Sequence, residues 1–348
     1  MQLPLPSSTI FATSSTGRRR WLQASSGLGL GLAAACFAPR LMAQTLPHLQ
    51  DEVWTDASRS RAVPALLRWP DGVDPASGNA AGKVQGVVIF SHGMGGRRTG
   101  ADVWGKAWAQ AGMLVVHLQH PGSDNEALRG GFSALAKANS PEQLLVRVAD
   151  VKFAIDEMQR KTAAKQGPWA DVPLQRLAVA GHSYGARTVQ ALAGQNYPKA
   201  NGWSGLDKRI KAFVAMSPAL GKGANAAQAQ LDAKAMTRPM LLVSGSLDGE
   251  VLNNGETVES RRMVYDALPT GRKALLYLQG ADHLTFAGID KVIPSNFLMR
   301  REAATLATEV THQRTVASVT AAWLKAQLLD QTMPVPAGLD AGDLWLQG

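Results

Sequence analysis

Cysteine is almost absent from this sequence of 348 residues. The single one, Cys36, lies in a segment that we expect to be removed on export. Without a thiol, the mature chain has no disulfide, no thiolate metal site and no cysteine nucleophile. Long apolar runs are also missing, since none reaches the roughly 18 residues that indicate a transmembrane helix. We therefore expect no stable membrane span in the mature protein.

Runs of like charge are missing too, although the formal net charge is +9. Four of the positive charges are arginines before residue 44, in a stretch that contains no aspartate or glutamate. The remaining lysines and arginines form no block of the kind that binds a phosphate backbone. The charge pattern therefore favours a solvated basic surface, and we expect no nucleic-acid partner.

The N-terminus has the features of an export signal. Arg18-Arg19-Arg20-Trp21-Leu22-Gln23 resembles a twin-arginine motif, a weakly apolar stretch follows at 28–38, and Leu41-Met42-Ala43 is a plausible cleavage site. We predict a signal peptide at 1–43 and a linker at 44–50. The predicted partner of the signal is the twin-arginine export machinery, and the predicted location is the periplasm or the exterior of the cell.

Two alternatives to a cleaved export signal remain open. The N-terminal segment could be an amphipathic helix that belongs to the fold. Ala33-Ala34-Ala35-Cys36 also partly resembles a lipobox, although Leu32 is one position too early. In that case the protein would be anchored to lipid through Cys36.

Beyond residue 50, short β-branched apolar runs alternate with longer helical patterns. The runs predict strands at 84–90, 113–118, 177–180, 212–216, 240–243 and 274–278. Because these runs are apolar on both faces, they indicate a parallel sheet with helices on both sides. The helical patterns are at 101–111, 141–158, 186–193 and 303–329, the last as one or two helices.

This alternation predicts the fold class and the domain boundaries. We expect one doubly wound, mostly parallel α/β domain over 51–330, which opens with an antiparallel hairpin at 51–70. Residues 331–348 are predicted to be a C-terminal tail. The segment 123–139 is the only one long enough to form a small cap.

The strongest local motif is Gly181-His182-Ser183-Tyr184-Gly185. A Gly-x-Ser-x-Gly sequence is weak evidence by itself. Here, however, it follows a predicted strand and precedes a predicted helix, which is the strand–turn–helix context of a nucleophile elbow. Glycines suit this turn because larger side chains would collide with the neighbouring strand and helix. Ser183 is therefore the predicted nucleophile.

A serine hydroxyl needs a base, and the base needs an acid that fixes its tautomer. His283 follows the last predicted parallel strand, in a loop from which an imidazole can reach Ser183. Asp248 follows the preceding strand, so the chain order is serine, aspartate, histidine, as a nucleophile elbow of this architecture requires. Asp282 and Glu250 compete for the role of the acid, but Asp248 leaves its strand directly and needs no bend in the chain.

The same chemistry needs backbone N–H groups aimed at a developing oxyanion. The amide of Tyr184 is one candidate, because it follows the nucleophile at the start of a helix. The second should come from the loop Ser91-His92-Gly93-Met94-Gly95-Gly96, after the first parallel strand. Within this loop we predict the amide of Met94, with Gly95 as the alternative.

Taken together, these motifs resemble those of α/β-hydrolases, in the branch of bacterial dienelactone-hydrolase-like and platelet-activating-factor-acetylhydrolase-like esterases. The resemblance covers about residues 51–330. Besides the elbow and the glycine loop, it rests on Trp54-Thr55-Asp56, Arg59-Ser60-Arg61, His120-Pro121-Gly122, Arg147-Val148-Ala149-Asp150 and Asp282-His283-Leu284-Thr285-Phe286.

The resemblance implies hydrolysis of small-molecule or lipid-like carboxylic esters through an acyl-enzyme, with no cofactor and no metal. Dienelactone hydrolases proper use a cysteine nucleophile, so the presence of Ser183 means that lactone specificity does not carry over. Two other functions remain open. One is a peptidase or amidase of the same fold, and the other is a catalytically silent binding protein.

Overall fold

The computed structural model describes residues 49–76, 84–130, 134, 137–197, 203–220, 225–250, 255–295 and 300–348. The predicted signal peptide, 1–43, lies outside these residues, as does most of the predicted linker, 44–50. Part of 123–139, the segment long enough to form a cap, also lies outside them.

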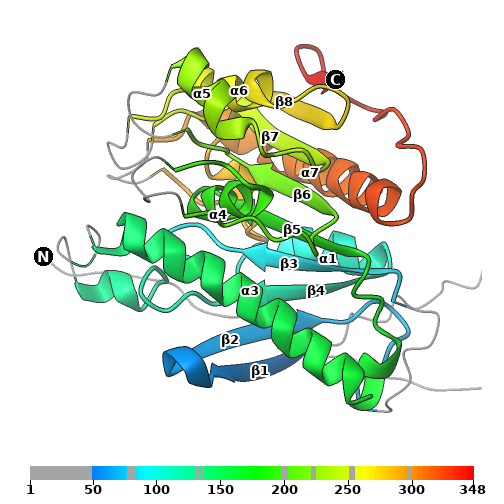
Figure 1. The fold of residues 1–348 in the computed structure, drawn as a ribbon. Helices are drawn as coiled ribbons and strands as arrows, with labels where there is room; N and C mark the ends of the chain where they lie inside the picture. The colour runs from blue at the N-terminus through cyan, green and yellow to red at the C-terminus, as the bar shows by residue number, and fades with distance from the viewer. Residues whose placement is uncertain are drawn as a thin grey trace, which may run out of the picture. The chain divides into compact units, whose positions relative to one another are not determined.

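A mixed nine-stranded sheet forms the centre of the domain, in the order β1-β2-β4-β3-β5-β6-β7-β8-β9 (Figure 1). The strands are β1 (Leu49–Asp56), β2 (Arg61–Arg68), β3 (Gly86–Ser91), β4 (Met113–Leu118), β5 (Leu177–His182), β6 (Ala212–Met216), β7 (Met240–Leu247), β8 (Lys273–Asp282) and β9 (Leu344–Gln347). Strands β3 to β8 run parallel to one another. The antiparallel pairs lie at the two sides of the sheet: β1 with β2, β2 with β4, and β8 with β9.

Helices cover both faces of this sheet. They are α1 (Asp102–Gln110), α3 (Pro141–Ala163), α4 (Tyr184–Ala193), α5 (Ala226–Ala233), α6 (Val258–Ala267) and α7 (Ala303–Leu328). Figure 1 shows α3 and α4 on the near face and α1 and α7 on the far face. This arrangement confirms the predicted fold class, a doubly wound, mostly parallel sheet that opens with an antiparallel hairpin.

The hydrophobic core is double, with one layer on each face of the sheet. Strands that are buried on both faces require this, because each face needs its own apolar cover. Trp104 and Trp108, one turn apart on α1, are fully buried in the layer beneath α7. Their indole N–H groups donate to the carbonyl of Phe286 (3.1 Å) and the hydroxyl of Thr320 (2.9 Å), so this tryptophan pair packs the helix.

The C-terminal part of the chain contains one long helix and one additional strand. Of the two forms expected for 303–329, one helix or two, the structure shows one continuous helix, α7. The predicted tail, 331–348, ends in β9, which pairs with β8 from Ala274 to Tyr277. Among the helices that the structure describes, none combines the length and the apolar character needed to cross a membrane.

Candidate active site

Ser183 occupies a strained turn between β5 and α4. Its backbone has φ 57° and ψ −116°, a conformation that residues other than glycine rarely adopt. The Ser183 N–H donates to the carbonyl of Met216 at the end of β6 (2.9 Å), which ties the turn to the neighbouring strand. The turn therefore projects the Ser183 hydroxyl beyond the carboxyl edge of the sheet.

Glycines make this turn sterically possible. A Cβ on Gly185 would overlap the carbonyl oxygen of Ser91, and a Cβ on Gly181 would press on the backbone of Gly185. The close approach of α4 to β3 therefore depends on the missing side chains, as the motif predicted.

Gly185→Ala should destabilise the fold by about 2–3 kcal/mol, because backbone on both sides of the overlap must move. Thermal unfolding of the purified variant would measure this loss. Gly249→Ala is the matched control, since a Cβ there meets no atom within 4 Å. Equal melting temperatures for the two variants would contradict the steric argument.

The three predicted catalytic side chains lie in one hydrogen-bonded row. The Nε2 atom of His283 is 2.9 Å from the Ser183 hydroxyl, and its Nδ1 atom is 2.8 Å from Oδ1 of Asp248. Asp248 is fully buried and His283 nearly so, whereas Ser183 is partly exposed. The row therefore runs from the interior of the protein to a hydroxyl at its surface.

Asp248 stays ionised although it is buried. Burial raises the pKa of its carboxyl group, but the charge of Arg261 and the hydrogen bond with His283 outweigh burial and hold the pKa below its ordinary value. The hydroxyl of Ser244 also donates to Oδ2 (2.9 Å). Sequence reasoning missed Arg261, a buried residue of α6 whose Nε lies 3.0 Å from Oδ1 of Asp248.

The two competing acids are occupied elsewhere. Asp282 accepts hydrogen bonds from Arg301 at 2.6 and 2.9 Å and from the hydroxyl of Thr285 at 3.0 Å. Glu250 is exposed and accepts from the amide of Gly255 (2.5 Å). Among the described residues, Asp248 is thus the carboxylate that contacts the imidazole of His283.

The glycine loop after β3 lies against Ser183. A Cβ on Gly93 would be 3.4 Å from the Cβ of Ser183. The amide of Gly95 donates to the carbonyl of Ser123 (2.9 Å) and is therefore committed. No backbone acceptor for the amide of Met94 occurs in the part of the chain that the structure describes. Of the two loop amides predicted as donors, that of Met94 is thus the one without a backbone acceptor among the described residues.

The buried histidines near the site stay neutral. Burial lowers the pKa of His182 to about 3 and that of His120 to about 4. Burial likewise places the pKa of His92 well below its ordinary value. The Nε2 of His182 donates to the carbonyl of His283 (3.0 Å), and the two rings pack with their centroids 4.8 Å apart. His182 therefore supports the backbone of His283.

A second polar network joins motifs that are far apart in the sequence. Asp150 of α3 accepts from Arg59 (2.9 Å) and Arg61 (2.7 and 2.8 Å), and contacts His120 (3.1 Å). His120 in turn contacts the hydroxyl of Ser91 (3.0 Å) at the end of β3. The opening hairpin, the loop after β4 and α3 thus meet next to the end of β3, from which the glycine loop starts.

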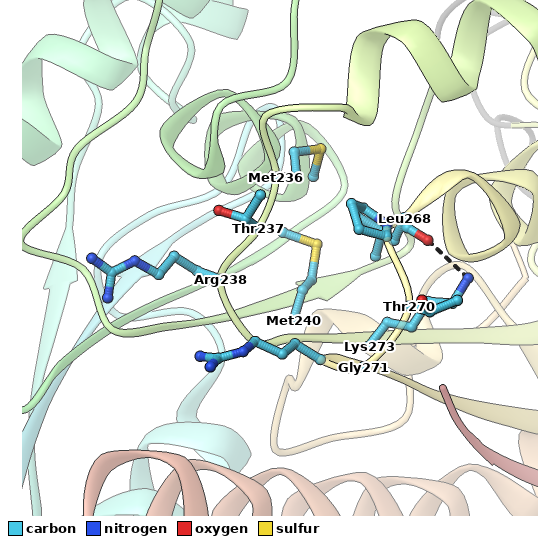
Figure 2. Close-up of a pocket in the computed structure, with 10 residues that line it drawn as sticks. Met236, Thr237, Arg238, Met240, Leu268, Thr270, Gly271 and Lys273 are labelled. Carbon is cyan, nitrogen blue, oxygen red and sulfur yellow. Dashed lines mark hydrogen bonds between the residues drawn. The ribbon is translucent and has the colours of Figure 1, made fainter.

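A cavity of about 250 Å³ lies at the amino ends of β7 and β8, away from the carboxyl ends that carry Asp248 and His283. Figure 2 shows that it is bordered by Met236, Met240 and Leu268, and that the amine of Lys273 donates to the carbonyl of Leu268 (2.9 Å). These residues precede or begin β7 and β8, whereas Asp248 and His283 follow these strands. Within the described ranges, no group of three or more His, Cys, Asp or Glu side chains is arranged to hold a metal ion.

No protein-family model matches this chain, and no curated protein sequence matches it. Among solved structures, a ferulic acid esterase from Streptomyces cinnamoneus is similar, with a TM-score of 0.58 and 16% identity over 88% of this chain and 98% of that one. A 2,6-dihydroxy-pseudo-oxynicotine hydrolase gives a TM-score of 0.49 and 11% identity over 84% of this chain and 72% of that one. The first likeness, together with the strand order, establishes the α/β-hydrolase fold.

Proposed function

We propose that this chain is a serine hydrolase that cleaves carboxylic esters through an acyl-enzyme. The observation that carries the proposal is the hydrogen-bonded row of Asp248, His283 and Ser183, with distances of 2.8 and 2.9 Å. A hydroxyl on a strained turn, an imidazole within hydrogen-bond reach of it and an ionised carboxylate are the three groups that nucleophilic acyl transfer needs.

In the first half of the proposed reaction, the Ser183 oxygen attacks the ester carbonyl carbon while its proton passes to Nε2 of His283. The carbonyl oxygen becomes an oxyanion and accepts hydrogen bonds from the amides of Tyr184 and Met94. Asp248 stabilises the imidazolium through Nδ1. The imidazolium then gives its proton to the departing alkoxide, which leaves as an alcohol.

In the second half, water attacks the acyl group on Ser183, and His283 takes a proton from that water. The tetrahedral intermediate collapses, the Ser183 oxygen leaves, and the imidazolium returns the proton to it. The products are a carboxylic acid and an alcohol, and the enzyme is restored. The cycle needs no electron transfer. In each half, His283 moves the proton, and Asp248 and the two backbone amides stabilise the charges that develop.

A substrate panel tests the proposal directly. It would compare p-nitrophenyl esters of graded chain length with peptide anilides, and it would include methyl ferulate because the similar solved structure is a ferulic acid esterase. Labelling with a fluorophosphonate probe would report the nucleophile independently of substrate. Faster anilide cleavage would favour an amidase, and absence of both labelling and turnover would indicate a silent binding protein.

We also propose export by the twin-arginine pathway. Replacing Arg18, Arg19 and Arg20 together with lysine keeps the charge but removes the paired arginines that the pathway reads. Unprocessed precursor should then accumulate in the cytoplasm, as cell fractionation and immunoblotting would reveal. Normal periplasmic accumulation of the triple variant would instead indicate general secretion.

A further inference from the structure

Arg261 is a fully enclosed arginine at the base of the candidate site. It lies in the first half of α6 and is 2% exposed, although its neighbour Arg262 is exposed. An arginine is rarely buried to this degree unless its five N–H donors are satisfied. The contacts of Arg261 therefore indicate what the side chain is there to do.

Those contacts join two loops that belong to different strands. The Nη1 group donates to the carbonyls of Ser217 (3.0 Å) and Pro218 (2.9 Å), which follow β6. The Nε and Nη2 groups donate to the carbonyls of Asp248 (2.7 Å) and Gly249 (3.2 Å), which follow β7. One rigid guanidinium thus fixes the segment that carries Asp248 against the end of the neighbouring strand.

Arg261 also contacts both members of the acid–base pair. Its Nε lies 3.0 Å from Oδ1 of Asp248, and its Nη2 lies 3.3 Å from Nδ1 of His283. When Nδ1 donates its hydrogen to Asp248, it has no lone pair left for Arg261. Nη2 is then a cation in contact with the His283 ring, which itself becomes cationic during the proposed reaction.

We infer that Arg261 is a positioning residue for the proposed hydrolysis: it fixes the loop of Asp248 and, through its charge, limits protonation of the Asp248–His283 pair. The inference rests on the proposed function. Arg261 reaches neither Ser183 nor the oxyanion donors in the described contacts, so it acts through Asp248 and His283.

The sign of the charge effect follows from the groups around His283. Asp248 faces it from the end of β7, Arg261 from α6, and neutral His182 from the end of β5. The neighbouring Asp282 is paired with Arg301. A positive charge in contact with the Asp248–His283 pair opposes the addition of a proton to that pair, so removing the charge of Arg261 favours the protonated pair. The loss of the inhibiting proton therefore moves to higher pH.

The test is the pH dependence of ester hydrolysis in three variants with intact Ser183. Arg261→Gln removes the charge and most of the hydrogen bonds. Arg261→Lys keeps a charge but cannot reach four carbonyls on two loops. Arg262→Gln makes the same chemical change on an exposed position of the same helix and serves as the control. For each variant, kcat and the pH profile of kcat/KM would be recorded with p-nitrophenyl acetate on purified protein.

Arg261→Gln should lower kcat by about 10²-fold, because the acid loses its fixed position. The acid limb of its pH profile, where activity rises as the inhibiting proton is lost, should move to higher pH by about one unit. Arg261→Lys should lower kcat by about tenfold, since part of the positioning is lost, and leave the acid limb in place. Arg262→Gln should match the wild type. The position of the limb does not depend on the fraction of folded protein, so a purely structural role would leave it unchanged in every variant.

Two results would overturn the inference. One is a pH profile of Arg261→Gln whose acid limb is unshifted, and the other is an unchanged kcat in Arg261→Lys. If Arg261→Gln does not fold, the kcat of Arg261→Lys alone tests the inference. Failure of the proposed function has a different signature. There the wild-type protein itself would neither hydrolyse the ester nor react with a fluorophosphonate at Ser183.

Discussion

Ser183→Ala should lower kcat for ester hydrolysis by about 10⁶-fold and abolish labelling by a fluorophosphonate probe. The loss is this large because the nucleophile and its base act as a unit, so that removing either removes the covalent route. The substitution keeps the Cβ, and the strained backbone of the turn is held by the Ser183 amide on Met216 rather than by the hydroxyl. The melting temperature should therefore change little.

Ser246→Ala is the matched control for this loss. Ser246 lies on β7, close to Asp248 in the sequence, and its hydroxyl accepts from the amide of Gly280 (2.8 Å) without entering the catalytic row. This variant should retain most of the activity and the label. If Ser183→Ala kept a large share of its activity, another serine would be the nucleophile and the proposed function would have to be rebuilt around it.

Asp248→Asn should lower kcat by about 10⁴-fold. An amide nitrogen at this position can donate to Nδ1 of His283, and Arg261, 3.3 Å from that atom, can donate to it as well. Both contacts favour the imidazole tautomer with hydrogen on Nε2, which cannot accept the proton of Ser183. The imidazolium would also lose its counter-charge. Steady-state kinetics on folded, purified protein would measure the loss.

Asp282→Asn and Glu250→Gln provide the comparison for Asp248→Asn. The carboxylate of Asp282 pairs with buried Arg301, so its loss should lower the melting temperature clearly, whereas the turnover number should change little. Glu250 is exposed, and its substitution should have little effect on either quantity. A nearly inactive Asp282→Asn variant beside an active Asp248→Asn variant would reverse the assignment of the acid.

The sequence was informative wherever a functional residue directly follows a buried strand. Ser183, Asp248 and His283 each stand at the carboxyl end of such a run, and parallel strands bring these ends to one edge of the sheet. Their chain order and the glycines of the elbow added independent constraints. Fold class and the proximity of the three side chains could therefore be predicted before any coordinates were known.

Arg261 could not be predicted in the same way. It stands beside Arg262 in a helix of mixed polarity, and sequence alone does not separate a buried arginine from an exposed one. Its burial depends on carbonyl groups of two loops that come together only in the folded sheet. The strand β9 escaped prediction for a related reason. Four residues on a sheet edge form no long apolar run, and their partner β8 lies far back in the chain.

The position of β9 has a consequence for the order in which the protein is completed. The chain emerges from the ribosome N-terminus first, so the hairpin β1–β2 and the turn of Ser183 are available early. His283 follows Ser183 by 100 residues. The edge of β8, the strand that leads to His283, is covered by Leu344–Gln347 of β9. Translation must therefore have passed β9 before this edge is covered, and the strand that positions His283 is the last of the parallel strands to gain both neighbours.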